Sequence, residues 1–171
     1  MTPLARYLSI WLREHLLVDR GVSHNTIDAY SQSLAALLRH AAERLGKQPS
    51  MLAFEDINAP LVLSFLETIE KNGVSVRTRN ARLAAIKAFF RFLEYRLPNA
   101  LEQIRQVQAI PRKKADEALV DWLTREEIAA LLGAPDPRRR DGIRDRAMLS
   151  LAYSCGLRVS ELINLQITDY D

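Results

Sequence analysis

The sequence predicts a mainly helical protein, in which one complete helical domain is followed by a shorter helical unit. The first observation is periodicity: apolar residues recur every three or four positions in successive stretches, the spacing that places them on one face of a helix. The second is that Ser23, Asn58 and Ser75, whose side chains can cap helices, stand directly before such stretches. The third is composition, because 48% hydrophobic and 26% charged residues among 171 is a balance typical of chains that fold around a core.

Four to five helices are expected in the first domain, residues 1–108. Proline or a capping side chain precedes the early ones, and glycine or proline follows several of them, as expected for helix ends. The expected ranges are 4–12, 23–45, 58–73, 75–97 and 101–107. Each range carries an apolar stripe that can face a shared core.

A linker is expected at residues 109–120, which contain Pro111 and mixed charges and have no apolar periodicity. A second unit, residues 121–171, then begins with Thr124 and Glu127, the spacing of a capping box. Its helices are expected at 124–132, 141–156 and 159–165, followed by the β-branched pair Ile167 and Thr168.

Several classes of protein are excluded or disfavoured by composition. One cysteine, Cys155, excludes an internal disulfide framework and a cysteine-rich zinc site. His15 and His40 have no ligand partners at helical spacing, so neither a metal nor a cofactor is expected. No membrane span and no secretory leader are expected, and these features together predict a cytoplasmic protein.

Positive charge is concentrated on the fourth expected helix. Residues 71–96 contain seven lysines and arginines and one acid, Glu94. The net charge of this segment is therefore +6, whereas that of the whole chain is +3. At about 100° per residue, Arg77, Asn80, Lys87 and Arg91 gather opposite the apolar stripe, with small alanines among them. This pattern is typical of a surface that binds nucleic-acid phosphates and base edges, although a solvated helix face would have a similar composition.

The second expected helix repeats this arrangement more weakly. Asn25, Gln32 and Arg39 lie opposite its apolar stripe, with Ala35 and Ala36 nearby. Taken alone, this face is better explained as ordinary solvated surface. Beside the basic helix, it becomes a second candidate for contact with nucleic acid.

A third candidate site is the segment from Cys155 to Leu162, CGLRVSEL. Gly156 ends one helix, Arg158 begins the next, and Glu161 follows within reach of the arginine across one turn. Arg158 could grip a phosphate with Glu161 orienting it, or the two could form a structural salt bridge. The residues alone leave both interpretations open.

At these segments the sequence resembles the tyrosine recombinase family, in its Xer-like and phage-integrase-like branch. SHNTIDAYSQSLAALLRH (23–40) and SVRTRNARLAAIKAFFRFL (75–93) are similar to the two helices of the family's core-binding domain that lie against DNA. LTREEIAALL (123–132) resembles the start of its catalytic domain, and residues 144–171 resemble the segment with its first catalytic arginine. The resemblance covers nearly the whole chain, in the family's order.

The resemblance implies a SAM-like helical core-binding domain followed by the helical opening of a mixed α/β catalytic domain. Its partners would be double-stranded DNA and other recombinase protomers bound to the same site. The family cleaves and rejoins DNA without metal or cofactor, through a 3'-phosphotyrosine. Arg158 would be the first catalytic arginine, with Glu161 in support.

The sequence also departs from the family pattern. Its five tyrosines do not stand in the family's nucleophile context, so no nucleophile is assigned, and the later catalytic residues of the family have no counterparts in the sequence. We therefore expect this chain to bind DNA but not to exchange strands alone. The alternative is a non-catalytic regulator that competes at a recombination site.

Overall fold

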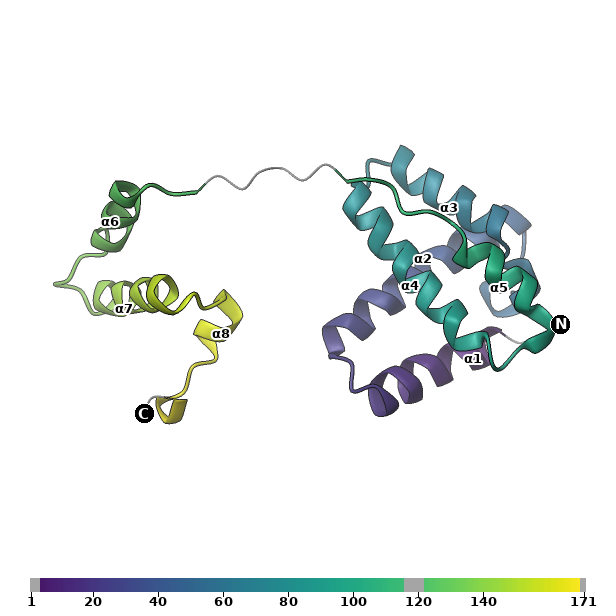
Figure 1. Cartoon of the computed structure of the whole chain (residues 1–171), viewed down its shortest axis with the longest axis horizontal. Coiled ribbons are helices and arrows are strands. Elements are labelled where there is room, and N and C mark those ends of the chain that lie inside the picture. Colours follow the sequence, from purple (N-terminus) through teal and green to yellow (C-terminus); the bar gives the residue numbers. More distant parts are fainter. Residues whose placement is uncertain (1–3, 116–121, 170–171) are drawn as a thin grey trace. The chain divides into compact units, whose positions relative to one another are not determined.

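The computed structural model describes residues 4–115 and 122–169. These residues form helices and connecting segments, and no strand is described among them. The chain divides into two compact units, Met1–Asp116 and Glu117–Asp171 (Figure 1). The predicted helical fold class is confirmed.

The described residues of the first unit form five α-helices. They are α1 (Leu4–Ile10), α2 (His24–Leu45), α3 (Ala59–Lys71), α4 (Val76–Leu93) and α5 (Leu101–Gln108). The predicted caps are present, because the hydroxyls of Ser23 and Ser75 and the side-chain oxygen of Asn58 each accept a backbone N–H from the first turn of their helix. Gly46 ends α2 in the left-handed conformation, which explains the stop at that position.

Two helix boundaries differ from the prediction. The first helix does not stop at Leu12 but continues as a π-helical segment, Trp11–Asp19, whose wider turns the three-and-four spacing of apolar residues does not indicate. The fourth helix ends at Leu93 rather than Leu97, where the backbone N–H groups of Glu94 and Arg96 bond to carbonyls three residues back, those of Arg91 and Leu93, instead of four.

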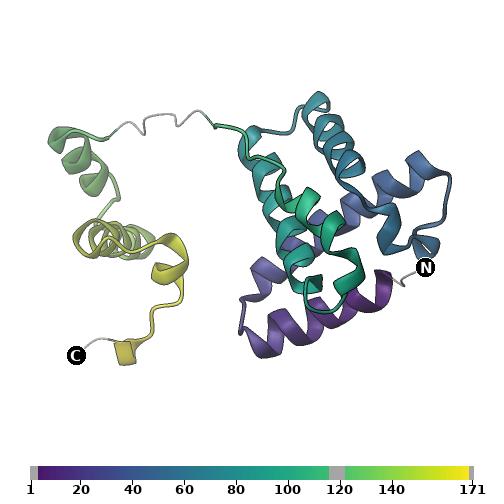
Figure 2. The ribbon, with the colours of Figure 1, turned by 45° about the vertical axis from the view of Figure 1, so that its right-hand side comes forward.

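Helix α4 lies at the centre of the first unit. It packs against α2, α3 and α5 (Figures 1 and 2). The apolar side chains that it turns toward them, such as Leu83 and Phe90, are buried. Aromatic rings fill much of this core: Phe89 contacts Trp11, and Phe90 contacts Phe54. A buried aromatic side chain of this size contributes roughly 1.5–3 kcal/mol, so the position of α4 is strongly fixed.

The second unit contains α6 (Arg125–Gly133), α7 (Arg140–Cys155) and α8 (Val159–Ile163). The predicted capping box is present, with Thr124 and Glu127 each accepting the other's backbone N–H. Among its described residues, Gly142 alone is buried, and large apolar side chains such as Trp122 (84% exposed) face solvent. The described part of this unit therefore has no core comparable to that of the first.

Candidate nucleic-acid interface

The exposed side of α4 carries the arginines that the sequence singled out. Arg77 and Arg91 are exposed, and neither side chain makes a hydrogen bond or an ion pair among the described residues. Ala84 is exposed between them, and Ala88 is half-buried. Because the apolar stripe of α4 packs on the core, the opposite side of the helix faces solvent. Positive charge and small side chains therefore share the outward face.

The exposed side of α2 carries the second set of candidates. Asn25, Gln32 and Arg39 are all exposed, as expected from a helix whose opposite stripe, including Leu34 and Leu37, is buried. Because α2 packs directly on α4, the two exposed sides belong to one packed pair of helices.

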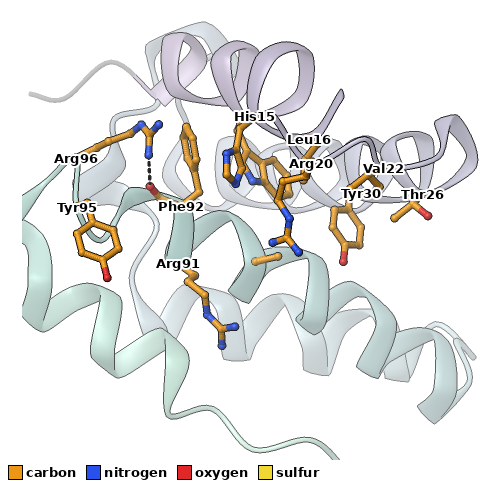
Figure 3. Close-up of a pocket in the computed structure, with 12 residues that line it drawn as sticks. His15, Leu16, Arg20, Val22, Thr26, Tyr30, Arg91, Phe92, Tyr95 and Arg96 are labelled. Atoms are coloured by element: carbon orange, nitrogen blue, oxygen red, sulfur yellow. Dashed lines mark hydrogen bonds between the residues drawn. The ribbon is translucent and has the colours of Figure 1, made fainter. Parts of the chain in front are cut away.

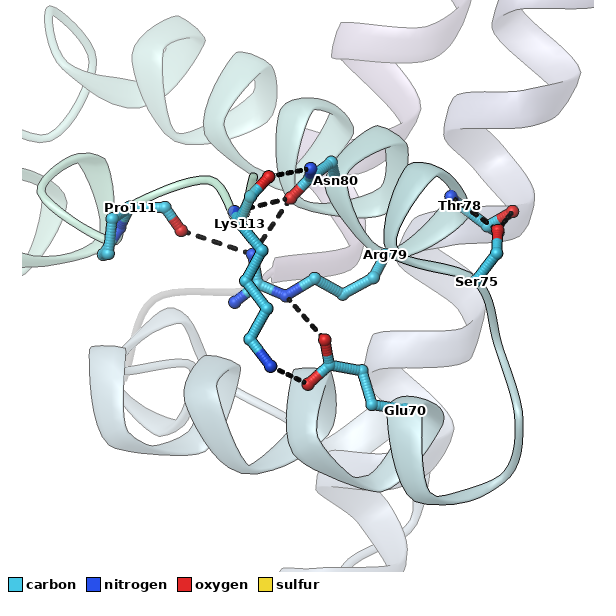
Figure 4. Close-up of polar contacts among 7 residues, drawn as sticks. All are labelled: Glu70, Ser75, Thr78, Arg79, Asn80, Pro111 and Lys113. Atoms are coloured by element: carbon cyan, nitrogen blue, oxygen red, sulfur yellow. Dashed lines mark hydrogen bonds and ion pairs between the residues drawn. The ribbon is translucent and has the colours of Figure 1, made fainter. Parts of the chain in front are cut away.

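The other two candidates on α4 are placed differently. Asn80 is 6% exposed, and both ends of its amide are occupied: Nδ2 donates to the Lys113 carbonyl at 2.7 Å, and Oδ1 accepts the Lys113 N–H at 3.0 Å (Figure 4). Lys87 is half-buried and donates from Nζ to the Gln108 carbonyl at 2.6 Å. Both residues therefore hold the segment after α5.

This segment, residues 109–113, is here called the strap. It runs antiparallel to α4, because Gln108 pairs with Lys87 while Lys113 pairs with Asn80 near the start of the helix. Ile110 of the strap is buried in the core. The sequence predicts a linker here because it contains no apolar period, but side-chain amides and backbone groups fix this part of it.

Arg79 and Glu70 complete the attachment of the strap. Arg79 is buried and donates from Nη1 to the Pro111 carbonyl and to Asn80 Oδ1, both at 3.2 Å (Figure 4). Its Nε lies 3.7 Å from Glu70 Oε1, close enough for an ion pair but too long for a hydrogen bond. The other oxygen of Glu70 accepts from Lys113 Nζ at 2.7 Å.

Two hollows flank Arg91. One, of about 360 Å³, lies between the π-helical segment, the start of α2 and the end of α4 (Figure 3). Arg20, Arg91 and Arg96 contribute positive charge to its lining. Arg96 is engaged, since its guanidinium donates to the Phe92 carbonyl and lies 3.8 Å from the centre of the Phe92 ring.

The other hollow, of about 230 Å³, is lined by Lys87 and Arg91 from α4 and by Arg112 from the strap. Burial, and then the positive charges of Arg112, Arg79 and Arg91, lower the pKa of the Lys87 ammonium below its usual value. Burial is the largest cause, and the neighbouring arginines lower this pKa further because like charges gather around the hollow.

Sequence reasoning missed Arg20 and Arg112. Arg20 lies eight residues beyond the predicted end of the first helix, and no periodic signal marks it. The run Arg112–Lys113–Lys114 is visible in the sequence, but it falls in the predicted linker. Only the strap's contacts with α4 show that Arg112 lies beside Lys87 and Arg91.

In the second unit, the predicted contact between Arg158 and Glu161 is present. Glu161 Oε1 accepts from the Arg158 guanidinium at 3.0 Å, and Oε2 accepts the Arg158 backbone N–H at 2.8 Å. The Arg158 side chain is 82% exposed. Glu161 therefore holds the arginine at the start of α8 while its remaining N–H groups face solvent; a catalytic role for the pair stays a prediction.

The part of the chain that the structure describes has no helix long and apolar enough to cross a membrane.

Cys155 is a free, exposed cysteine.

Comparison with known proteins agrees with this architecture. A model of the phage integrase N-terminal SAM-like domain matches residues 11–96, and a model of the phage integrase family matches residues 121–171. The first match covers α2, α3 and α4, and the second covers the unit that contains Arg158.

Individual relatives have recombinase names. The integrase/recombinase y4rC of Sinorhizobium fredii is 44% identical over 97% of this chain and 50% of its own length. Tyrosine recombinase XerC of Pelotomaculum thermopropionicum is 32% identical over 92% of this chain and 50% of its own length. Tyrosine recombinase XerD of Halalkalibacterium halodurans is 34% identical over 89% of this chain and 48% of its own length.

The chain thus spans about half the length of these curated relatives. Both family models match in the order expected from the sequence, and the helical first unit has the architecture that the first model describes. The chain belongs to the phage integrase family of tyrosine recombinases, and it contains the SAM-like N-terminal domain and the start of the catalytic domain.

Proposed function

We propose that this chain is the DNA-binding portion of a site-specific tyrosine recombinase, and that its first unit docks on duplex DNA through the exposed sides of α2 and α4. The observation that carries the proposal is the outward face of α4. There, Arg77 and Arg91 are exposed without an intramolecular partner and are separated by small side chains. Unpaired arginines next to alanines allow a helix to approach phosphates closely.

The exposed side of α2 supports the same docking surface. Asn25 and Gln32 have amides suited to base edges or phosphates, and Arg39 adds a charge further along the helix. Arg20 and Arg91 line the larger hollow, which lies between the π-helical segment, the start of α2 and the end of α4. They extend the cationic surface toward the start of α2.

Arg158 is proposed as the first catalytic arginine of the complete recombinase, in which a tyrosine attacks the scissile phosphate. A guanidinium can stabilise charge that develops on phosphate oxygens, and its fixed geometry helps only if another group orients it. The Glu161 carboxylate, bonded to both the backbone and the side chain of Arg158, fits that supporting role. We place the protein in the cytoplasm and expect other protomers of the family as partners on DNA.

Binding is tested by fluorescence anisotropy with a labelled duplex, titrated with the 171-residue chain at several salt concentrations. We expect the logarithm of the binding constant to fall linearly with the logarithm of the salt concentration, because arginine–phosphate contacts release counterions. Absence of binding at low salt, or binding that salt does not weaken, would contradict the proposal.

The chemistry is tested with a nicked suicide duplex that traps a phosphotyrosyl intermediate. We expect a shift on a native gel but no adduct that survives denaturation, because Arg158 can stabilise charge but supplies no nucleophile. An adduct that disappears in Tyr153→Phe would show that the active site is wrongly assigned.

A further inference from the structure

We propose that the strap completes the DNA-binding surface: Arg112 joins Lys87 and Arg91 to bind one phosphate group of the duplex backbone, and Asn80 is the positioning residue that holds Arg112 in place. This inference rests on the proposed function and adds to it a specific phosphate site. It assigns Arg112 a role that the sequence did not suggest, and it changes the expected role of Asn80 from contacting DNA to positioning the strap.

The hollow beside Arg112 has the composition of a phosphate site. Two arginines and one lysine line it together with Leu83, Ala84 and Ala88, and none of the described residues in its lining is acidic. Arginine provides paired N–H donors that match phosphate oxygens, and lysine adds a point charge. The alanines leave the space open on the side of α4.

The charges in this hollow lack an internal counterion. Arg112 is exposed, and among the described residues no carboxylate pairs with it or with Arg91. Lys87 uses one N–H for the Gln108 carbonyl, which leaves its other hydrogens available to an anion. Burial lowers the pKa of Lys87 most, and the neighbouring arginines lower it further.

The position of Arg112 depends on contacts on both sides of it. Pro111 accepts from Arg79, and Lys113 pairs twice with the Asn80 amide, so the backbone on either side of Arg112 is attached to α4. Asn80 is buried, and both the nitrogen and the oxygen of its amide bond to Lys113. Without Asn80, the strap would lose the paired bonds at Lys113, and Arg112 would no longer be held beside Lys87 and Arg91.

The first test compares Arg112→Ala with Lys114→Ala in duplex binding. Lys114 is an exposed cation two positions further along, outside the lining of the hollow, so its removal controls for the loss of one charge. Arg112→Ala should weaken binding about tenfold near 0.1 M salt and reduce the magnitude of the salt slope by about 0.9, as for one lost phosphate contact. Lys114→Ala should change affinity by less than about twofold, because Lys114 does not line the hollow and so loses no phosphate contact there. Equal effects of the two substitutions would overturn the proposal.

The second test measures coupling between Asn80 and Arg112. Asn80→Ala should weaken binding in the natural chain but have little further effect in the Arg112→Ala background. The reason is that Asn80 affects binding only by holding Arg112 in place. Additive effects would contradict positioning by Asn80. If Asn80→Ala does not fold, as judged by circular dichroism, Gln108→Ala replaces it, because that change removes another side-chain bond, which joins α4 to the end of α5 just before the strap.

Two further results separate this inference from the function on which it rests. If Arg77→Ala/Arg91→Ala weakens binding but Arg112→Ala matches Lys114→Ala, the docking surface stands and the strap site fails. If inorganic phosphate at millimolar concentration competes with duplex for the natural chain but equally for Arg112→Ala, the hollow does not recognise phosphate, and the proposal is again overturned.

Discussion

At the scale of single residues, Asn80 of α4 bonds to Lys113 of the strap through both the nitrogen and the oxygen of its amide. A helical wheel places Asn80 near Arg77 and Arg91, but it cannot show that a segment more than thirty residues later covers it. The Arg158–Glu161 contact could be predicted because both partners lie within one helical turn. Local spacing therefore predicts local contacts, while the contacts of Asn80 depend on where the chain returns.

Glu70 provides a prediction at this scale. Glu70→Gln should lower the free energy of unfolding by about 1–3 kcal/mol, because it leaves the buried guanidinium of Arg79 without its anionic partner. Glu67→Gln, one turn earlier on α3 and exposed, is the matched control and should change stability by less than about 0.5 kcal/mol. The measurement is urea unfolding followed by circular dichroism. Equal effects would show that the Glu70–Arg79 pair contributes nothing.

At the scale of elements, helix starts could be predicted because capping residues precede them in the sequence. Ser23, Asn58, Ser75 and Thr124 all cap the helices that they were predicted to cap. The π-helical continuation after Ile10 could not be predicted from local spacing, and its first residue, Trp11, packs against Tyr30 and Phe89, which lie far along the sequence. The strap escaped prediction for a similar reason, since its partners lie on α4.

The cap of α4 gives the prediction at this scale. Ser75→Ala should destabilise the first unit by about 1 kcal/mol, because the Ser75 hydroxyl accepts the Thr78 N–H and alanine cannot. Ser75→Asp should restore most of the loss, since an aspartate oxygen accepts the same bond and suits a helix N-terminus. Thermal unfolding measures both variants. A loss in Ser75→Asp as large as in Ser75→Ala would show that the cap is not the cause.

At the scale of the whole molecule, the two units differ in how completely they bury apolar side chains. The first has a contiguous core that includes Trp11, Phe65 and Phe90, each almost fully buried. In the second, Trp122 and Ile163 are largely exposed, and Gly142 is the one buried position among the described residues. The sequence predicts helices in both units, but periodicity alone does not show whether the apolar side of a helix is buried against another element.

This difference predicts unequal protection from hydrogen exchange in the 171-residue chain. Amides of α2 and α4 should exchange slowly, at rates set by global unfolding, whereas amides of α6, α7 and α8 should exchange orders of magnitude faster through local opening. Mass spectrometry of peptides from the same sample makes each unit the control for the other. Similar protection in both units would mean that the second is covered by the first or by another molecule.

The central claim is that the outward face of α4 docks on duplex DNA, and the most direct test is the salt dependence of binding by Arg77→Ala/Arg91→Ala. Both side chains are exposed and have no intramolecular bonds, so their loss should leave the fold unchanged. Arg6→Ala/Arg105→Ala, which removes equal charge from exposed positions on α1 and α5 outside both hollows, is the control. We predict that the magnitude of the slope of log binding constant against log salt falls by up to about two for the α4 pair and stays nearly constant for the control. An unchanged slope for Arg77→Ala/Arg91→Ala, or an equal fall for both pairs, would contradict docking through α4.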